Sequence, residues 1–293
     1  MTTSLPKVLF VGLGMMGRPM AALIAQAGYP LVVSDTDADV VGQVCEETGA
    51  QPLDASENLS DVGVVITMLP NSRIVNQVLV GSYGLATRLQ SGACIVDMSS
   101  SEPLETQKLA EQLESMSLEF LDAPVSGGVK RAISGKLAIM VGGNESTLQK
   151  HAQLISVLGT ITHVGPAGAG HAVKALNNYV SAAGLLATVE ALHAGEKFGI
   201  DPAIMTTVLN NASGANFATE NKVHQFMLSG TYASGFALQL MVKDLKIAVS
   251  LGEQMEQPMK LGHECLAVWQ EAAEHSNPRT DHTEMYRIVG DHG

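Results

Sequence analysis

The chain has few of the features that mark secreted, metal-binding or membrane proteins. Its 293 residues include only three cysteines, Cys45, Cys94 and Cys265, which lie far apart and form no CxxC spacing. A disulfide framework is therefore not indicated, and we expect reduced thiols and a cytoplasmic location. The nine histidines show neither HxH nor HExxH spacing, so we predict no metal site.

Basic residues and long apolar runs are also scarce. The 17 Lys and Arg are outnumbered by 29 Asp and Glu, which argues against a nucleic-acid partner because phosphate binding needs clustered cations. No stretch of 18 apolar residues is free of charges and amides, so we expect no membrane partner. The first apolar run, VLFVGLGMMG, does not have the pattern of a signal peptide.

The first 165 residues alternate between short apolar runs and segments of helical spacing. This alternation, with short connections, predicts an α/β fold with a Rossmann-type, doubly wound and mostly parallel sheet in residues 1–165. The predicted strands are 7–11, 31–34, 62–68, 93–97, 118–122 and 137–141, and the predicted helices are 18–27, 37–48, 72–79, 103–115 and 145–158.

The pattern changes after residue 165, where no further strand is indicated. Residues 169–198 are rich in Ala, Leu and Gly at helical spacing, and Asp201–Pro202 is typical of a helix start. Two more helices are expected to begin near Ser234 and Pro258. We therefore predict an all-α domain over 166–293, which serves substrate binding and dimerisation.

A glycine motif, GLGMMG, follows the first predicted strand and opens the first predicted helix. In a dinucleotide fold the first glycine allows the tight turn, the second lets the backbone approach the pyrophosphate, and the third lets the helix pack on the sheet. S-adenosylmethionine enzymes also use glycine turns, but a complete GxGxxG favours a dinucleotide. The predicted cofactor loop is Gly12, Leu13, Gly14, Met15, Met16 and Gly17.

Asp35 ends the second predicted strand, 23 residues after Gly12. A carboxylate there accepts hydrogen bonds from the ribose hydroxyls and repels a 2′-phosphate. The segment SDTDAD around it contains no basic residue. We therefore predict NAD rather than NADP as the cofactor.

Three further motifs follow strand ends, where open α/β sheets bind their ligands. ITMLPNS places Leu69 and Pro70 beside the expected cofactor, and DMSSSEP places Ser100 near the cofactor or the substrate. DAPVSGG offers a hydroxyl and unobstructed backbone N–H groups for a carboxylate at Ser126, Gly127 and Gly128. Taken singly, each of these motifs is also compatible with an ordinary turn.

Lys174 and Asn178 lie four residues apart on the long helical segment, so their side chains share one face. A lysine on a mostly apolar helix is suited to proton transfer beside a nicotinamide. The simpler interpretation, a surface lysine with a solvated amine, remains open from these residues alone.

In order along the chain, GLGMMGRPM, ITMLP, DMSSSEP, DAPVSGG, GAGHAVKALNN and KDL resemble the motifs of the β-hydroxyacid dehydrogenase family. This family includes 3-hydroxyisobutyrate dehydrogenase, tartronate semialdehyde reductase and L-threonate dehydrogenase. The resemblance implies that Lys174 is the catalytic proton carrier and that Asn178 holds the substrate. It also implies that Ser126–Gly128 bind the substrate carboxylate, that Ser100 contacts nicotinamide and substrate, and that Lys243 contacts the cofactor.

The chain departs from the family pattern at two places. Lys130 and Arg131 follow the carboxylate loop where many relatives have Gly-Ala, so they are either a solvated pair or a place for a second anionic group. Ile74 stands where relatives often have a polar residue that contacts the cofactor.

The resulting hypothesis is an NAD-dependent oxidoreductase that transfers hydride between nicotinamide and the 3-position of a short 3-hydroxy carboxylic acid. An NADPH-dependent semialdehyde or imine reductase is an alternative, as is a non-catalytic NAD-binding scaffold. The expected partners are the small carboxylic acid and further copies of the chain in a homodimer or homotetramer.

Overall fold

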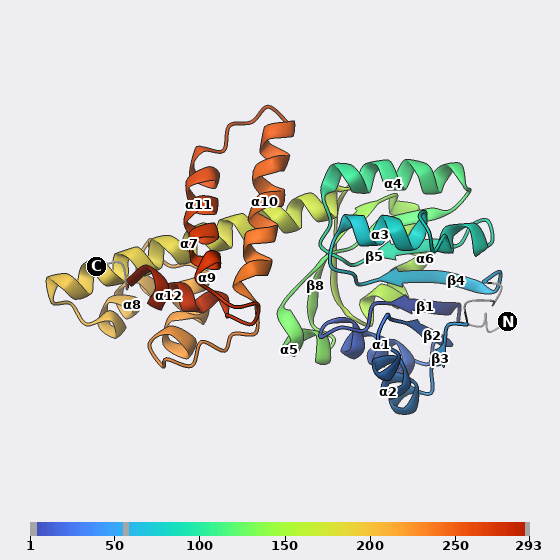
Figure 1. The fold of residues 1–293 in the computed structure, drawn as a ribbon, viewed down its shortest axis with the longest axis horizontal. Helices are drawn as coiled ribbons and strands as arrows, with labels where there is room; N and C mark the ends of the chain where they lie inside the picture. Colours follow the sequence, from blue (N-terminus) through green and yellow to red (C-terminus); the bar gives the residue numbers. More distant parts are fainter. Residues whose placement is uncertain (1–4, 55–58, 291–293) are drawn as a thin grey trace. The chain divides into compact units, whose positions relative to one another are not determined.

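The computed structural model describes residues 5–54 and 59–290, and it divides into two compact units, Met1–Lys174 and Ala175–Gly293. The first unit contains a nine-stranded sheet flanked by helices (Figure 1). Its strands are β1 (Lys7–Val11), β2 (Leu31–Ser34), β3 (Gln51–Pro52), β4 (Val62–Thr67), β5 (Cys94–Asp97), β6 (Glu119–Asp122), β7 (Val125–Ser126), β8 (Leu137–Gly143) and β9 (Gly159–Gly165).

The sheet has the order β3-β2-β1-β4-β5-β6-β8-β7, with β9 paired to β8. Strands β1 to β6 pair in parallel, whereas β8 runs antiparallel to both β6 and β7. Strand β1 lies between β2 and β4, so the strand order reverses there, as a doubly wound sheet requires. The predicted fold class is thus confirmed. The pattern missed β3 and β7, each of two residues, and β9, whose GTITHVG sequence is mostly exposed or half-buried.

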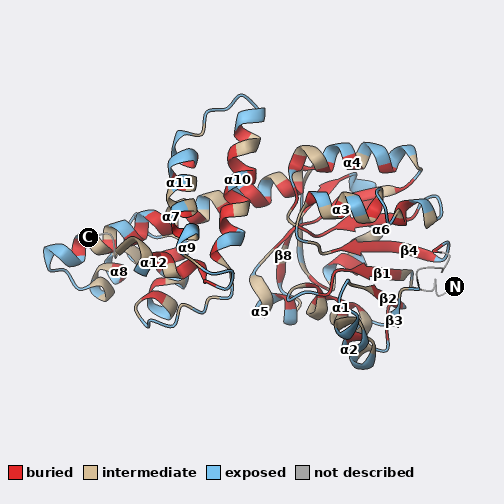
Figure 2. Cartoon of the chain, in the orientation of Figure 1, coloured by how far each residue is buried: buried red, intermediate tan, exposed pale blue. Residues whose placement is uncertain are grey.

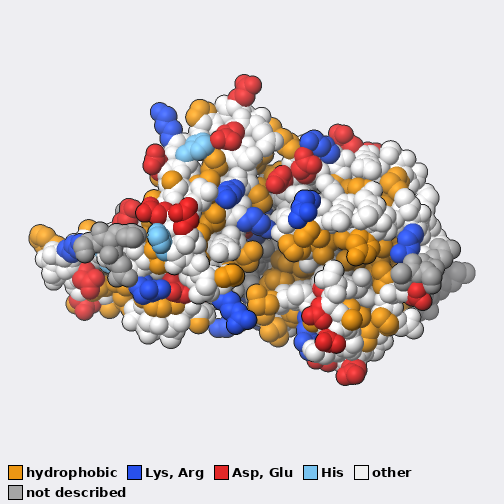
Figure 3. Space-filling view, in the orientation of Figure 1, with side chains coloured by type: hydrophobic (Ala, Val, Ile, Leu, Met, Phe, Trp, Pro, Cys, Tyr) orange, Lys and Arg blue, Asp and Glu red, His pale blue; other side chains and the backbone are white. Residues whose placement is uncertain are grey.

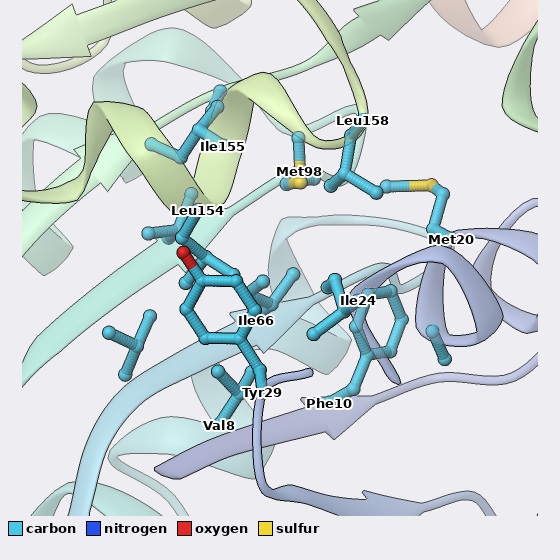
Figure 4. Packing of buried hydrophobic residues seen from close by; sticks show 14 of the residues in the cluster. Val8, Phe10, Met20, Ile24, Tyr29, Ile66, Met98, Leu154, Ile155 and Leu158 are labelled. Carbon is cyan, nitrogen blue, oxygen red and sulfur yellow. The ribbon is translucent and has the colours of Figure 1, made fainter. Parts of the chain in front are cut away.

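Alternating residues of the strands bury opposite faces of this sheet. On one face Val8 and Phe10 pack with α1, α5 and α6, and Figure 4 shows Ile24 of α1 beside Phe10. On the other face Leu9 packs with α3 and α4. The helices of this unit are α1 (Gly17–Gln26), α2 (Ala38–Thr48), α3 (Ser72–Leu79), η1 (Leu85–Arg88), α4 (Pro103–Ser115), α5 (Gly128–Ile133) and α6 (Glu145–Ser156).

Helix α7 (Ala169–Phe198) begins in the first unit and continues into the second, with the division after Lys174. The described part of the second unit is helical apart from one isolated bridge, Ala237 with Asp281. The domain division at residue 165/166 stays a proposal. The remaining helices are α8 (Pro202–Asn210), α9 (Phe217–Asn221), η2 (Val223–Met227), α10 (Leu238–Gln254), α11 (Lys260–Glu274), η3 (His282–Glu284) and α12 (Met285–Gly290).

The core of the second unit surrounds Trp269, which is fully buried against residues of α7 and α10. Buried and exposed residues alternate along α10 and α11, so each helix has one core-facing stripe (Figure 2). Helix α10 begins at Leu238 rather than near Ser234, because the backbone N–H groups of Gly235 and Phe236 donate to Asp281. None of the described helices is long and apolar enough to cross a bilayer.

Candidate active site

The glycine motif forms the turn between β1 and α1, and its outer glycines cannot be replaced without a collision. Gly12 has φ +99°, and a Cβ there would strike the carbonyl oxygen of Met68. A Cβ at Gly17 would strike the carbonyl oxygen of Gly12. The first glycine therefore lets β4 approach the turn, and the last lets α1 pack onto it.

The middle glycine lies beside open space instead. A Cβ at Gly14 would meet no atom within 4 Å, and the neighbouring Met15 is 75% exposed. No side chain caps the start of α1, and its first turn contains no acidic residue. Exposed backbone N–H groups beside a glycine with no side chain suit the pyrophosphate of a dinucleotide, so the loop fits the expected cofactor.

Asp35 follows β2 and holds the glycine loop directly. Its Oδ2 accepts a hydrogen bond from the N–H of Leu13 at 2.6 Å, and its Oδ1 accepts from the N–H of Asp37 at 3.0 Å. Acidic side chains gather over the neighbouring α2 (Figure 3). The cation nearest in sequence to the loop, Arg18, is paired with Glu47. This surrounding charge is unfavourable for a 2′-phosphate.

The ends of β4 and β5 lie against the same loop. The side chain of Leu69 lies close to Gly12, and its N–H donates to Ser99 Oγ at 2.9 Å. Pro70 is exposed, and Ser100 is half-buried next to Ser99. Ile74 is half-buried, and its N–H donates to the capping side chain of Asn71. The structure therefore brings Leu69 to the glycine turn and Ser100 to the adjoining loop.

The glycines of the predicted carboxylate loop are required by its backbone shape. Gly127 has φ +133° and Gly128 has φ +67°, a region that residues with a Cβ rarely adopt. A side chain at Gly127 would collide with that of Arg131, whereas one at Gly128 would meet no atom within 4 Å. The loop after Ser126 is therefore a shaped turn with one open side, and flexibility alone does not explain its glycines.

The first turn of α7 is bound to the carboxyl end of β6. Asp122 is fully buried, and it accepts the N–H of Gly168 at 2.8 Å and the N–H of His171 at 2.9 Å. Lys174 lies one turn further along α7 and is only 9% exposed. Burial at this level contradicts the interpretation of Lys174 as an ordinary surface lysine.

A second buried carboxylate lies at the end of β5. Asp97 Oδ1 accepts from Thr67 Oγ1 at 2.8 Å and from the N–H of Ser99 at 3.1 Å. Its Oδ2 accepts from Ser101 Oγ at 3.2 Å. Asp97 thereby ties the ends of β4 and β5 together beneath the loop that carries Ser100.

In the second unit, Asn178 and Lys243 meet at one aspartate. Asn178 is 6% exposed, and its Nδ2 donates to Asp244 Oδ2 at 2.5 Å. Lys243 Nζ lies 3.9 Å from the other oxygen of Asp244. The carboxylate therefore orients the amide of Asn178, because only the amide nitrogen can donate to it.

The predicted residues of the first unit form a continuous series of contacts from Asp35 through the glycine loop, Leu69 and Ser99 to the start of α7. Sequence reasoning missed three buried groups that support them, namely Asp97, Asp122 and His171. Asp97 and Asp122 each end a predicted strand, which was an available signal. Nothing in the pattern distinguished His171.

One group of possible metal ligands occurs among the described residues, at the opposite ends of the strands. Ligand atoms of Cys94, Glu119 and His151 lie within 4.8 Å of one another. Burial raises the pKa of the Cys94 thiol, which disfavours the thiolate that a metal needs. Lys150 already binds Glu119. We therefore assign no metal to this group.

Comparison with known proteins agrees with this geometry. The family model for the NAD-binding domain of 6-phosphogluconate dehydrogenase matches residues 7–165. The model described as NAD-binding of NADP-dependent 3-hydroxyisobutyrate dehydrogenase matches residues 168–289. Together the two models extend over the sheet, the glycine loop and the helical part of the chain.

Individual relatives cover most of the chain. It is 38% identical to 2-(hydroxymethyl)glutarate dehydrogenase of Eubacterium barkeri over 87% of this chain and 85% of that one. It is 32% identical to the NAD-dependent L-serine dehydrogenase of Pseudomonas aeruginosa over 90% and 91%. A solved structure of Mycobacterium tuberculosis 3-hydroxyisobutyrate dehydrogenase with L-serine superimposes with a TM-score of 0.90, at 28% identity, over 97% of this chain and 99% of that one.

These matches run through the nucleotide-binding loop, the strand ends and the helix that carries Lys174, and the matched relatives are dehydrogenases of hydroxy acids. The chain therefore belongs to the β-hydroxyacid dehydrogenase family and is a nicotinamide-dinucleotide-dependent oxidoreductase of hydroxy acids.

Proposed function

We propose that the chain oxidises a short 3-hydroxy carboxylic acid with Lys174 as the general base, and reduces the product with Lys174 as the general acid. Bound NAD supplies the hydride acceptor. The Lys174 amine takes the hydroxyl proton while the hydride leaves C3, so the C–OH becomes C=O. The observation that carries this proposal is the burial of Lys174 one turn after the helix start that Asp122 holds.

The open carboxylate loop supports the choice of substrate. Ser126 contributes a hydroxyl, and the positive φ of Gly127 and Gly128 turns the backbone so that N–H groups can face one anion. A 3-hydroxy acid carries its carboxylate two carbons from the reacting carbon, so in this proposal the turn at Ser126–Gly128 holds the carboxylate while Lys174 takes the hydroxyl proton. Asn178, oriented by Asp244, is the proposed contact for the carbinol oxygen.

For the cofactor we propose NAD in preference to NADP. Asp35 is the ribose-facing carboxylate in this proposal, and the acidic α2 follows it. Leu69, Pro70, Ser100 and Lys243 remain proposed cofactor contacts. Because Asp35 also accepts the N–H of Leu13, a change at this residue alters the loop as well as the ribose site.

Arg131 gives a reason to test substrates with a second carboxylate. Its side chain lies against Gly127, inside the turn that we assign to the first carboxylate, and the adjacent Lys130 is exposed. The 38% identical relative is named for a dicarboxylic acid, 2-(hydroxymethyl)glutarate. We propose that a cation on this turn favours acids that carry a second anionic group.

The deciding experiment measures NADH absorbance while NAD or NADP is paired with single acids. The panel contains 3-hydroxyisobutyrate, L-serine, D-glycerate, L-threonate and 2-(hydroxymethyl)glutarate. Turnover of one acid with NAD supports the proposal, and a preference for 2-(hydroxymethyl)glutarate that is lost in Arg131→Ala supports the role of the cation. Binding of NADH without turnover of any acid in the panel would leave a non-catalytic scaffold as the better description.

We also propose that the chain forms a homodimer or homotetramer through the second unit. Among the described residues of this unit, seven large apolar ones are more than half exposed: Val180, Phe198, Ile204, Val208, Phe217, Met255 and Leu261. A surface of this kind is typical of an interface between subunits. Sedimentation of the purified chain and of Ile204→Glu tests this, because a monomeric wild type would contradict it.

Cytoplasmic location is a further proposal, supported by the three free cysteines. Burial raises the pKa of the Cys265 thiol to about 11, so it stays protonated and unreactive. Fractionation of cells that produce the protein tests the location.

A further inference from the structure

His171 is a buried ring at the start of α7 that the proposed reaction does not use. It is 1% exposed and lies three residues before Lys174, hence one turn earlier on the helix. Its backbone N–H donates to Asp122, as described above, which leaves the ring free to make contacts of its own.

The two ring nitrogens of His171 contact two different elements. Nδ1 lies 2.8 Å from Thr106 Oγ1 on α4, and Nε2 lies 3.2 Å from the carbonyl oxygen of Ser99, after β5. A buried carboxylate lies 3.8 Å from each nitrogen, Asp122 from Nδ1 and Asp97 from Nε2. On the Nε2 side, the Ser99 carbonyl oxygen and the Asp97 carboxylate are both acceptors.

These neighbours determine one hydrogen position. A carbonyl oxygen can only accept, so Nε2 carries the hydrogen that it donates to Ser99. The Thr106 hydroxyl has one hydrogen and two neighbours, because it also lies 3.0 Å from the carbonyl oxygen of Glu102. The bond to Thr106 therefore does not determine which atom is the donor. The bond to Ser99 does, because it requires a hydrogen on Nε2.

This bond connects the two segments on which the reaction depends. Ser99 precedes Ser100 and accepts the N–H of Leu69, which in turn packs on the glycine turn. The His171 ring thus joins the helix turn that carries Lys174 to the loop that carries Ser100. A shift of about 1 Å in such a spacing can lower a rate 100-fold.

We propose that His171 is a positioning residue, which sets the spacing between Lys174 and the Ser99–Ser100 loop through its Nε2–H bond to Ser99. The inference deepens the proposed function and rests on it. His171 does not contact substrate in this proposal, and it acts through the two segments that it joins.

Two amide replacements test the bond separately from the volume of the ring. The amide nitrogen of His171→Gln can reach the place of Nε2 and donate to Ser99, whereas that of His171→Asn reaches only the place of Nδ1. We expect His171→Asn to lower kcat 10- to 100-fold and His171→Gln to restore it to within about 3-fold of wild type. The KM for NAD should change less than 3-fold, since the glycine loop is intact.

His282→Asn is the matched control, because His282 is also a buried histidine beside an aspartate, in the second unit. It should lose stability without losing kcat at a temperature where all variants are folded. If His171→Asn keeps the wild-type kcat there, or His171→Gln falls as far as His171→Asn, the proposal is wrong.

Hydrogen exchange gives a readout that needs no substrate. Peptides that contain residues 97–101 and 168–174 should both exchange faster in His171→Asn and return to wild-type rates in His171→Gln. Unchanged exchange in both peptides would overturn the link even if no acid is turned over. Absence of wild-type turnover together with the expected exchange would count against the proposed substrate class, and the link would stand.

Discussion

The two units each bury an aspartate beside a histidine, yet the two pairs are built for different work. Asp122 and His171 are 49 residues apart, and they join a strand end to the helix that carries Lys174. Asp281 and His282 are neighbours in the chain, 3.5 Å apart, and they join the C-terminal segment to the start of α10. The residue types are the same, but Asp122 binds the start of a helix, whereas Asp281 binds the segment before one.

The contacts of Asp281 explain why we regard the second pair as structural. Its carboxylate accepts from the backbone N–H groups of Gly235, Phe236 and Thr283 and from the hydroxyl of Ser234. Hydrogen bonding to a buried aspartate thus closes a turn in the second unit and supports stability. In the first unit the same device holds the helix turn that carries Lys174, the proposed proton carrier. We therefore expect changes at the first pair to lower turnover, and changes at the second pair to lower the free energy of unfolding.

The largest expected effect is on turnover, at the residue that the first pair presents. Lys174→Ala should lower kcat by about 10²- to 10⁴-fold, because the proton of the hydroxyl then has no positioned acceptor. NADH binding, followed by fluorescence titration, should survive. Lys197→Ala, an exposed lysine near the end of the same helix, is the matched control, and equal turnover in both variants would refute the role of Lys174.

Removing the aspartate of the second pair should change stability instead. Asp281→Ala leaves buried N–H donors without an acceptor, at a cost of about 3 kcal/mol in the free energy of unfolding. Urea unfolding measures this loss. At a temperature where the variant is folded its kcat should match the wild type, and a large fall in kcat there would erase the contrast between the pairs.

The histidine of the second pair should make stability depend on pH. Burial, together with the charge of Lys222, lowers the pKa of His282 from 6.5 to about 4. Below pH 6.5 the unfolded chain binds a proton that the folded chain refuses. Stability should therefore fall by about 3 kcal/mol as the pH drops from 6.5 to 4.

Asp281 should add to the loss at still lower pH. Burial alone would raise the pKa of its carboxyl, but hydrogen bonds from Thr283 and Ser234 outweigh that effect and hold the pKa below its ordinary value. Its contribution is lost as the pH falls below about 3.8. Urea unfolding of wild type and His282→Gln between pH 7 and 4 checks the contribution of the histidine. If the free energy of unfolding falls equally in both proteins over this range, that contribution is refuted.

The smallest effect is expected at Asp244, which orients Asn178, the proposed substrate contact of the second unit. Asp244→Asn removes the carboxylate that accepts from Asn178, so the amide of Asn178 can rotate and exchange the places of its oxygen and nitrogen. We expect kcat/KM for the acid to fall about 10-fold. Comparison with Glu253→Gln, an exposed acid of the same helix, controls for the loss of charge. An unchanged kcat/KM in Asp244→Asn would mean that Asn178 needs no such partner.

Much of the architecture was predictable, because it depends on local pattern. The glycine motif after an apolar run, the strand–helix alternation and the long helix of residues 169–198 all agree with the structure. Helix α10 was predicted to begin too early, since Asp281 binds Ser234, Gly235 and Phe236 from 45 to 47 residues away. Strand β9 was missed because its residues are exposed or half-buried, so they show no buried apolar pattern. Its extended conformation depends on backbone pairing with β8.

For the site, the chain's own order of residues determines which groups are available. These are the glycines that the tight turn requires, Asp35 at a strand end, and Lys174 one helical turn from Asn178. Tertiary structure alone decides which of them are held and how. The burial of Lys174 is one such outcome. The hydrogen bonds from Asp122 to α7 and from His171 to Ser99 are others, and they join residues that are 46 to 72 positions apart. Helical periodicity acts over a few residues, whereas a buried carboxylate or ring selects its partners by distance in space, which no local pattern records.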